Sequence, residues 1–341
     1  MQALAKLKPE PGLWRTEAAV PPCGPDEVLI RVKKTAICGT DLHIHQWDDW
    51  ARATVPVPMI IGHEYAGEIV EIGRAVTREL LVGQRVTGEG HIIDINSTAA
   101  RAGRFYLDPA TVGVGVNRQG AFAEYLAIPA FNVIPLPDHV SDDIAALLDP
   151  FGNAVHAAQQ FDLMGEDVLV TGAGPIGIMA AAVARRSGAR SVVITDHNPF
   201  RLRLAARLSD IRPVNVARED LQAVMAAEGI VDGFGVALEM SGAHAAILQC
   251  IEGLRMGGKL ALLGLPAKSM EMSWSSIILK ALVIKGVYGR QMFETWRKMF
   301  GLIHSGLDLD PLITHRLPAC EFRAGFDAAL SGEAGKVVLS W

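Results

Sequence analysis

The sequence predicts an α/β protein with two parts, a β-rich first part followed by a doubly wound parallel sheet. After about residue 165, six apolar segments alternate with mostly helical ones, the pattern of buried parallel strands joined by helical crossovers. Before residue 150, short strand-like runs are punctuated by glycine and proline, which is typical of a barrel or sandwich. The 341 residues, half of them hydrophobic and a fifth charged, suffice for two domains with a sizeable core.

Three strands and one capped helix are expected in the first part. The strands fall at 28–33, after a turn of Pro, Gly and Asp, at 67–73, which glycine bounds, and at 122–128, which stops at Pro129. Ser141, followed by two aspartates, predicts a helix N-terminus, because its hydroxyl can cap the helix and acids suit the first turn. Pro150 predicts a kink or break in that helix near Asp149.

The second part is expected to hold the parallel sheet. Its apolar runs place strands at 167–171, 191–195, 213–216, 234–240, 259–264 and 282–287. Helices are then expected at 295–305 and 321–331, and 336–340 forms a closing strand that could return to the first part. We therefore divide the chain into one domain of residues 1–150 and 295–341 and a second of residues 151–294.

Composition narrows the classes of function. The net charge of −5 argues against nucleic acid or an anionic membrane surface as a main partner. The most apolar stretch, 168–184, is interrupted by three glycines and a proline, so a strand, turn and helix are expected there instead of a membrane span. The first eight residues lack the apolar core of a signal peptide, and the four cysteines are too scattered for a disulfide framework. We expect a soluble cytoplasmic protein.

A glycine-rich turn predicts a dinucleotide site. Gly172, Gly174 and Gly177 follow an apolar strand and open an apolar helix, so they permit a tight turn, close approach of a pyrophosphate and close helix packing. The helix N-terminus offers N–H donors to the phosphates. Asp196 ends the next strand, where a carboxylate would accept the ribose 2′-hydroxyl, so NAD is expected over NADP. Arg201 is the nearby cation that could weaken this preference for NAD. The alternative to a dinucleotide site is a purely structural turn capped by the aspartate.

Cys38, His63 and Glu64 together offer the sulfur, nitrogen and oxygen ligands that suit Zn²⁺. His63 and Glu64 are adjacent, so on a regular strand they would point to opposite faces. They could face one ion only on an irregular turn, which Gly62 makes possible. The alternatives are a core cysteine and a surface His-Glu pair. A site with three protein ligands leaves one position for substrate.

With these residues the chain resembles the zinc-containing medium-chain dehydrogenases, most closely those that oxidise L-threonine. The matching segments are 34–44 (KTAICGTDLHI), 62–65 (GHEY), 113–118 (GVGVNR), 149–156 (DPFGNAVH) and 288–296 (YGRQMFETW). The resemblance implies a GroES-like catalytic domain, a Rossmann cofactor domain and NAD-dependent oxidation of L-threonine to 2-amino-3-oxobutanoate by a homotetramer.

The resemblance also implies roles for single residues. Cys38, His63 and Glu64 would bind the catalytic zinc, Thr40 and His43 would relay a proton, and Asp149 would lie beside the metal. The residues that would contact NAD are Ile176, Asp196, Arg201, Leu263, Gly264, Leu265, Val287 and Tyr288. Zinc would lower the pKa of the substrate hydroxyl, hydride would pass to the nicotinamide, and the released proton would leave through the relay.

One departure from the family is large. Members usually carry four cysteines after the Gly-Glu-Gly-His segment, binding a structural zinc, whereas the matching positions here are Asp94, Ser97, Ala100 and Asp108. Two carboxylates, a hydroxyl and a methyl cannot replace four thiolates, so we expect one zinc per chain and a lobe held by packing or partly disordered.

Two rival functions remain open. A zinc-dependent polyol or other secondary-alcohol dehydrogenase would share this chemistry, and a non-catalytic nucleotide-binding protein would share the fold. The anchors of the substrate carboxylate and ammonium do not follow from the sequence, although Arg290 and His91 are worth testing.

Overall fold

The computed structural model describes residues 1–208, 210–266 and 268–341, which form two compact units. The first contains Met1–Pro150 and Ile313–Trp341, and the second contains Phe151–Leu312. This division differs from the expected one at residues 295–312, which include most of helix α11 (Glu294–His304) and are grouped with the second unit. In this unit the Arg290 guanidinium lies 5.5 Å from the centroid of the Trp296 ring. Among the described residues, no helix is long and apolar enough to cross a membrane.

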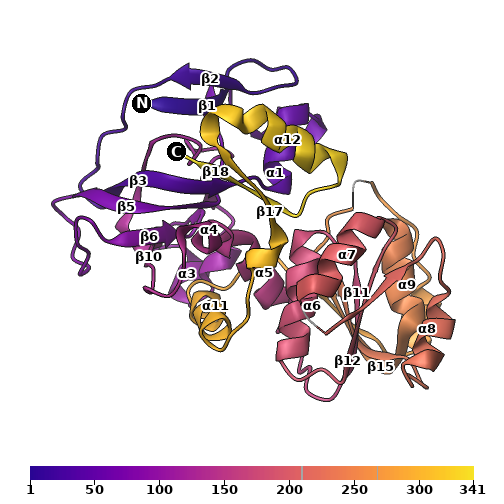
Figure 1. Cartoon of the computed structure of the whole chain (residues 1–341). Coiled ribbons are helices and arrows are strands. Elements are labelled where there is room, and N and C mark those ends of the chain that lie inside the picture. Colours follow the sequence, from indigo (N-terminus) through magenta and orange to yellow (C-terminus); the bar gives the residue numbers. More distant parts are fainter. Residues whose placement is uncertain (209, 267) are drawn as a thin grey trace. The chain divides into compact units, whose positions relative to one another are not determined.

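The first unit is β-rich, as its glycine and proline punctuation predicts (Figure 1). Its strands are β1 (Gln2–Lys6), β2 (Trp14–Glu17), β3 (Glu27–Ala36), β4 (Met59–Ile60), β5 (Tyr65–Ile72), β6 (Arg85–Gly88), β7 (His91–Ile92), β8 (Val112–Gly113), β9 (Tyr125–Pro129), β10 (Val133–Pro135), β17 (Ile313–Pro318) and β18 (Lys336–Ser340). Its helices are α1 (Gly39–Gln46), α2 (Asp49–Thr54), α3 (Thr98–Arg101), α4 (Asp142–Ala145) and α12 (Phe322–Ser331), with 3₁₀ turns η1 (Phe105–Leu107), η2 (Ala130–Asn132) and η4 (Ala319–Glu321).

The main sheet of this unit has the order β10-β6-β5-β3-β18-β17, and β9 also pairs with β3. The closing strand β18 runs antiparallel to β3, with Val338 opposite Ala36, so the end of the chain returns to the expected domain. Apolar residues that alternate along β3 and β9 are buried together with Tyr65 and Ile69 of β5. The sheet therefore follows the period of two that half-buried strands require.

Helix α4 ends at Ala145, with Ala146 as its C-cap residue, and helix α5 (Leu148–Ala158) begins after Leu147. Ser141 caps α4 by accepting the Ile144 N–H, as predicted. The expected break at Pro150 lies a few residues earlier, because Pro150 stands in the first turn of α5, where no helical partner is needed for its missing N–H.

The second unit holds a parallel sheet of order β13-β12-β11-β14-β15-β16, the doubly wound arrangement of dinucleotide-binding domains (Figure 1). Its strands are β11 (Asp167–Thr171), β12 (Ser191–Asp196), β13 (Arg212–Asn215), β14 (Phe234–Glu239), β15 (Leu254–Leu262) and β16 (Val283–Gly286). Its helices after α5 are α6 (Pro175–Arg186), α7 (Pro199–Leu208), α8 (Leu221–Ala227), α9 (His244–Gly253), α10 (Trp274–Leu279) and α11, with the 3₁₀ turn η3 (Asp310–Leu312). The central strand β14 is buried along its whole length, so its near-continuous apolar run reflects burial on both faces.

Candidate functional site

Cys38 lies in the turn between β3 and α1, where it is the N-cap residue of α1. Its backbone N–H donates to Asp41 Oδ2 at 2.9 Å, so the buried Asp41 carboxylate stabilises this turn. Burial raises the pKa of Asp41, and the nearby His63 ring and the Cys38 N–H oppose this rise. The turn holds the sulfur of Cys38 at the start of the helix.

His63 and Glu64 lie on an irregular turn that leads into β5. Gly62 has φ +90°, and a Cβ added there would approach Phe122 Cδ1 to 2.2 Å, so only glycine fits this position. The turn brings both side chains toward Cys38, and one ligand atom from each of the three residues lies within 4.8 Å of the others. Within the described part of the chain, this is the group of His, Cys, Asp and Glu side chains that could hold a metal ion.

The donor set fits zinc. Cys38 Sγ, a His63 nitrogen and a Glu64 oxygen are the ligand types of catalytic zinc sites with an open fourth position. His63 Nδ1 and Glu64 Oε1 are both buried without a hydrogen-bond partner among the described residues. Buried polar atoms are nearly always paired, so these two orphaned atoms indicate a missing charged partner.

A lysine that sequence reasoning missed lies behind Glu64. Lys336, on β18, donates from Nζ to Glu64 Oε2 at 2.5 Å and to the Ile37 carbonyl at 2.8 Å. Both charged side chains are almost fully buried. Burial alone lowers the pKa of Lys336, but the Glu64 carboxylate raises it, and the net shift is upward. Lys336 therefore fixes Oε2 of Glu64, and Oε1 remains available to a metal ion held with Cys38 and His63.

Neighbouring sulfur and carboxyl groups raise the pKa of the His63 imidazole. Burial alone lowers this pKa, but the Cys38 sulfur and the carboxyls of Asp41 and Asp149 raise it well above its usual value. Asp149 lies in the first turn of α5, and its Oδ1 would be 3.5 Å from a Cβ placed on Gly90. The structure thus places Asp149 close enough to act on the charge of the cluster.

Thr40 and His43 lie three residues apart on α1, so they share a face of this helix. Thr40 Oγ1 is 3.9 Å from Cys38 Sγ, next to the metal cluster. His43 is exposed, and its Nδ1 is 2.5 Å from Asp48 Oδ2. Thr40 therefore lies beside Cys38, and His43 lies at the surface.

The glycine turn after β11 has the geometry of a phosphate cradle. Gly172 has φ +91°, and a Cβ on Gly177 would lie 1.8 Å from the Gly172 carbonyl oxygen. A Cβ on Gly174 would meet no protein atom within 4 Å, so the space beside this residue is open to a ligand. Gly174 is the N-cap of α6, which begins at Pro175, so the free N–H groups of the first turn lie at this open space.

Asp196 ends β12 beside this turn, and it is already engaged with the backbone. Its Oδ2 accepts the Ala173 N–H at 2.7 Å, and its Oδ1 accepts the Asn198 N–H at 2.8 Å. Arg201, on α7, has a buried Nε without a partner among the described residues. The carboxylate therefore keeps lone pairs for a ribose hydroxyl, while it also tightens the turn.

The other predicted cofactor residues follow the carboxyl ends of neighbouring strands. Ile176 is half-buried in the first turn of α6. Leu263, Gly264 and Leu265 follow β15, while Val287 and Tyr288 follow β16. Leu265 and Tyr288 are 90% and 57% exposed. A doubly wound sheet binds dinucleotides outside the carboxyl ends of its strands, and these residues follow such ends.

The lobe between β7 and β8 has the four positions where the family carries cysteines. Asp108 is buried, and its carboxylate accepts the N–H groups of Asp94 at 2.7 Å and Ala110 at 3.2 Å. The Ser97 hydroxyl caps α3 by accepting the Ala100 N–H. These side chains are occupied with the backbone of the lobe, and they do not form a second ligand group among the described residues.

The two side chains considered as substrate anchors are both engaged with the protein. His91 Nδ1 lies 3.2 Å from Oε1 of the buried Glu89. Arg290 is fully buried, with Nη1 3.4 Å from Asn153 Oδ1 and its guanidinium over the Trp296 ring. These contacts position both side chains within their own units.

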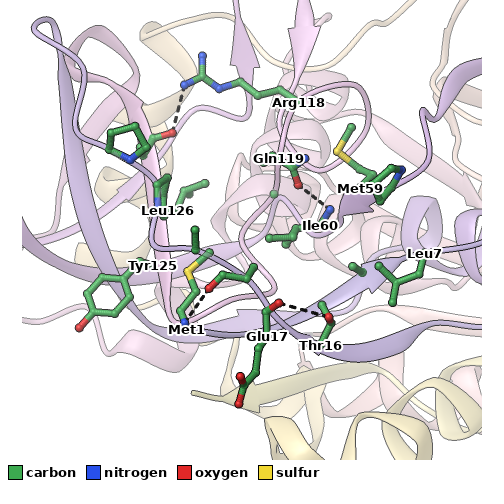
Figure 2. Close-up of a pocket in the computed structure, with 18 of the residues that line it drawn as sticks. Met1, Leu7, Thr16, Glu17, Met59, Ile60, Arg118, Gln119, Tyr125 and Leu126 are labelled. Carbon is green, nitrogen blue, oxygen red and sulfur yellow. Dashed lines mark hydrogen bonds between the residues drawn. The ribbon is translucent and has the colours of Figure 1, made fainter.

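A separate cavity of about 520 Å³ lies in the first unit. Figure 2 shows side chains that line it. None of the candidate ligand, relay or cofactor residues lines it. Two of its polar side chains are bonded to the protein backbone: Gln119 Oε1 accepts the Ile60 N–H at 2.7 Å, and Arg118 donates to the Ala127 carbonyl at 3.2 Å. The cavity is therefore separate from the candidate ligand, relay and cofactor residues.

Comparisons with known proteins agree with this geometry. Residues 24–138 match the alcohol dehydrogenase GroES-like domain, and residues 175–305 match the zinc-binding dehydrogenase domain. The chain is 61% identical to an L-threonine 3-dehydrogenase of Ruegeria pomeroyi and 57% identical to that of Escherichia coli K12, over the full length of each chain.

Solved structures show the same architecture. An alcohol dehydrogenase from Thermus sp. ATN1 superposes with a TM-score of 0.91 at 29% identity, covering 100% of this chain and 99% of that one. A 2R,3R-butanediol dehydrogenase from Bacillus subtilis gives a TM-score of 0.90 at 25% identity with the same coverage.

Proposed function

This chain belongs to the zinc-containing medium-chain dehydrogenases, and from that premise we propose that it oxidises L-threonine to 2-amino-3-oxobutanoate with NAD⁺. The observation that carries the proposal is the three-ligand group of Cys38, His63 and Glu64 with its two orphaned buried atoms. The identity of 61% and 57% to two L-threonine 3-dehydrogenases over their full length supports the choice of substrate.

Cys38, His63 and Glu64 are the residues that would hold the catalytic zinc. A bound zinc supplies Lewis-acid chemistry, which lowers the pKa of a substrate hydroxyl and stabilises developing negative charge. The protein contributes the rigid ligand geometry: Asp41 fixes the Cys38 turn, and Lys336 fixes Glu64. Lys336 also adds a positive charge beside the ligands, which favours an anionic oxygen at the open position.

Thr40 and His43 would carry the hydroxyl proton away. The proton of the substrate O–H bond would pass through the Thr40 hydroxyl to the His43 imidazole and then to water, and NAD⁺ would supply the hydride acceptor. The exposure of His43 supports the last step, because a base at the surface exchanges protons with solvent directly.

The second unit would hold NAD⁺, which accepts the hydride. The open space beside Gly174 and the N-terminus of α6 would take the pyrophosphate, with Ile176 beside it, and Asp196 would accept a ribose hydroxyl. The remaining proposed contacts are Arg201, Leu263, Gly264, Leu265, Val287 and Tyr288.

We also propose one zinc per chain. Asp94, Ser97 and Asp108 all accept backbone N–H groups of the lobe, and Ala100 offers no ligand atom. Oxygen ligands alone bind zinc weakly, so a tight second site would need sulfur or nitrogen donors.

A homotetramer in the cytoplasm completes the proposal. Strand β16 ends the order of the parallel sheet, and large apolar side chains near this edge are exposed: Val283 at 50%, Trp274 at 69%, Ile278 at 71% and Leu279 at 74%. An exposed apolar edge of this kind supports pairing with a second copy of the chain about a two-fold axis.

The test is NAD⁺ reduction with a substrate panel. We expect kcat/KM for L-threonine to exceed that for a polyol or a simple secondary alcohol by at least about 100-fold, because a site with partners for a carboxylate and an ammonium rejects substrates that lack them. Faster oxidation of a polyol would favour the first rival function. No NADH with any alcohol would favour the non-catalytic one.

Cys38→Ser tests the metal ligand within the same assay. We expect turnover to fall by at least about 100-fold, because zinc stabilises the transition state by several kcal/mol, while NAD binding to the other unit stays nearly unchanged. Cys320→Ser is the matched control, since Cys320 is an exposed free cysteine. Near-normal activity of Cys38→Ser with zinc still bound would remove Cys38 from the ligand set.

A further inference from the structure

The Asp48 carboxylate lies next to His43, a contact that was not apparent from the sequence. Asp48 Oδ2 is 2.5 Å from His43 Nδ1, at the surface of the first unit. The other oxygen of Asp48, Oδ1, accepts the Ala51 N–H at 3.0 Å, because Asp48 is the N-cap of α2. One carboxylate therefore caps a helix and contacts the imidazole at the same time.

The backbone between the two helices sets this contact. Trp47, the C-cap of α1, has φ +57° and ψ +47°, a left-handed conformation that costs energy for a residue other than glycine. Its N–H donates to the His43 carbonyl at 2.9 Å, and its indole is buried in the core with Ile44 and Ala51. The buried indole thus holds the turn that returns Asp48 to His43.

The contact selects one form of the imidazole. Burial alone raises the pKa of Asp48, but the Ala51 N–H and the His43 ring together lower it by more, so its net pKa lies below the usual value. The carboxylate is therefore ionised and can only accept hydrogen bonds. Nδ1 of His43 must therefore carry the hydrogen. In a neutral imidazole, Nε2 then holds the lone pair.

We propose that Asp48 is a positioning residue for proton transfer, which holds His43 in the tautomer whose Nε2 accepts the proton leaving the active site. This inference rests on the proposed role of His43 in the dehydrogenase reaction. The proton arrives at Nε2 and forms the imidazolium, which the Asp48 carboxylate stabilises, and it then leaves from Nε2 to water. No other covalent bond changes at His43.

Asp48→Asn is the variant that tests the proposal. Asparagine is as good an N-cap as aspartate, so α2 should stay folded, but an amide is uncharged and can donate to Nδ1 and favour the wrong tautomer. We expect kcat to fall roughly 10- to 100-fold, part of the 10²–10⁴-fold that general acid–base catalysis supplies. The KM values for L-threonine and NAD⁺ should stay within about two-fold, because neither ligand contacts Asp48 in this proposal.

Two controls separate this role from a structural one. Asp49→Asn removes the same charge from the next residue, whose carboxylate contacts the exposed Arg52 at 3.4 Å, and it should leave kcat unchanged. In a His43→Gln background, Asp48→Asn should lower kcat less than two-fold further, because its partner is already gone. An undiminished effect of Asp48→Asn in that background would overturn the proposal, as would a kcat of Asp48→Asn within two-fold of the unaltered chain.

A readout that needs no turnover distinguishes failure of this inference from failure of the proposed function. ¹⁵N NMR of histidine-labelled protein, with His43 assigned from the His43→Gln spectrum, should show hydrogen on Nδ1 in the unaltered chain and its loss in Asp48→Asn. Hydrogen on Nε2 in the unaltered chain would overturn the inference. An unaltered chain that shows the Nδ1 tautomer but does not oxidise L-threonine would refute the proposed function instead.

Discussion

Replacing Lys336 by methionine probes the buried charge pair that supports the metal ligands. The side chains of Lys336 and Glu64 are 4% and 0% exposed, with Nζ 2.5 Å from Oε2. At an effective dielectric constant of about 20, two unit charges at this distance attract by roughly 7 kcal/mol, most of which offsets the loss of hydration. Removing one partner of such a pair typically costs about 3–5 kcal/mol, because the other charge stays buried alone.

We therefore expect Lys336→Met to lower the unfolding free energy of the metal-free protein by about 3–5 kcal/mol. Urea unfolding followed by tryptophan fluorescence measures this change. Zinc should restore part of the loss, because the ion compensates the charge of Glu64, so the stabilisation by zinc should be larger in the variant than in the unaltered chain. Lys34→Met is the matched control: Lys34 pairs with Asp143 at 3.1 Å while partly exposed, so its loss should be about 1 kcal/mol or less.

A double variant gives the sharpest test of this reasoning. Glu64→Gln alone leaves Lys336 buried and unpaired, whereas Lys336→Met with Glu64→Gln removes both charges. The metal-free double variant should be more stable than either single variant, because no isolated charge remains in the core. Losses that simply add, or a loss below about 1 kcal/mol for Lys336→Met, would refute the account of the pair.

Three further perturbations have defined outcomes. Asp196→Ser should weaken NAD binding and relax the discrimination against NADP, because a ribose hydroxyl loses its acceptor and a phosphate loses a repulsion; an unchanged ratio of the two affinities would show that Asp196 is not the discriminating residue. Gly177→Ala should destabilise the protein by at least about 1–3 kcal/mol in thermal unfolding, since its Cβ would lie 1.8 Å from a backbone oxygen; wild-type stability would contradict the turn geometry. Burial alone raises the pKa of Asp143, but Arg316 and Lys34 lower it by more, so its net pKa lies below the usual value. The stability that this carboxylate contributes is therefore present above about pH 4 and is lost as the pH falls through its folded pKa. Asp143→Asn should flatten that acid limb of the unfolding curve, and an unaltered limb would exclude this carboxyl as its cause.

Local patterns predicted the parts of the site that depend on neighbouring residues. The parallel sheet followed from its buried apolar runs, and the turn at Gly172 followed from glycine spacing because each glycine answers a local steric need. Gly62 likewise explained how adjacent residues could face one ion. Such features are determined within a few residues, so a single sequence reveals them.

Contacts that depend on the assembled fold were not predictable in this way. Lys336 lies 272 residues from Glu64, and only the pairing of β18 with β3 brings them together. Asp48 lies close to His43 in sequence, but their contact needs a left-handed tryptophan, a conformation that sequence does not favour. Arg290 was considered as a substrate anchor, and its full burial over the Trp296 ring did not follow from the sequence, because that contact depends on the folded chain.

The central claim is that one zinc, bound by the group at Cys38, His63 and Glu64, serves NAD⁺-dependent oxidation of L-threonine. Its most direct test is to remove metal by mild chelation and titrate zinc back while measuring bound zinc and NADH formation on the same samples. We predict that the chelated chain stays folded but inactive, because the Asp108 carboxylate accepts backbone N–H groups that hold the lobe at 92–110 together. Threonine oxidation should then rise in proportion to bound zinc and saturate at one ion per chain. Full activity without zinc, or saturation at two tightly held ions, would contradict the account.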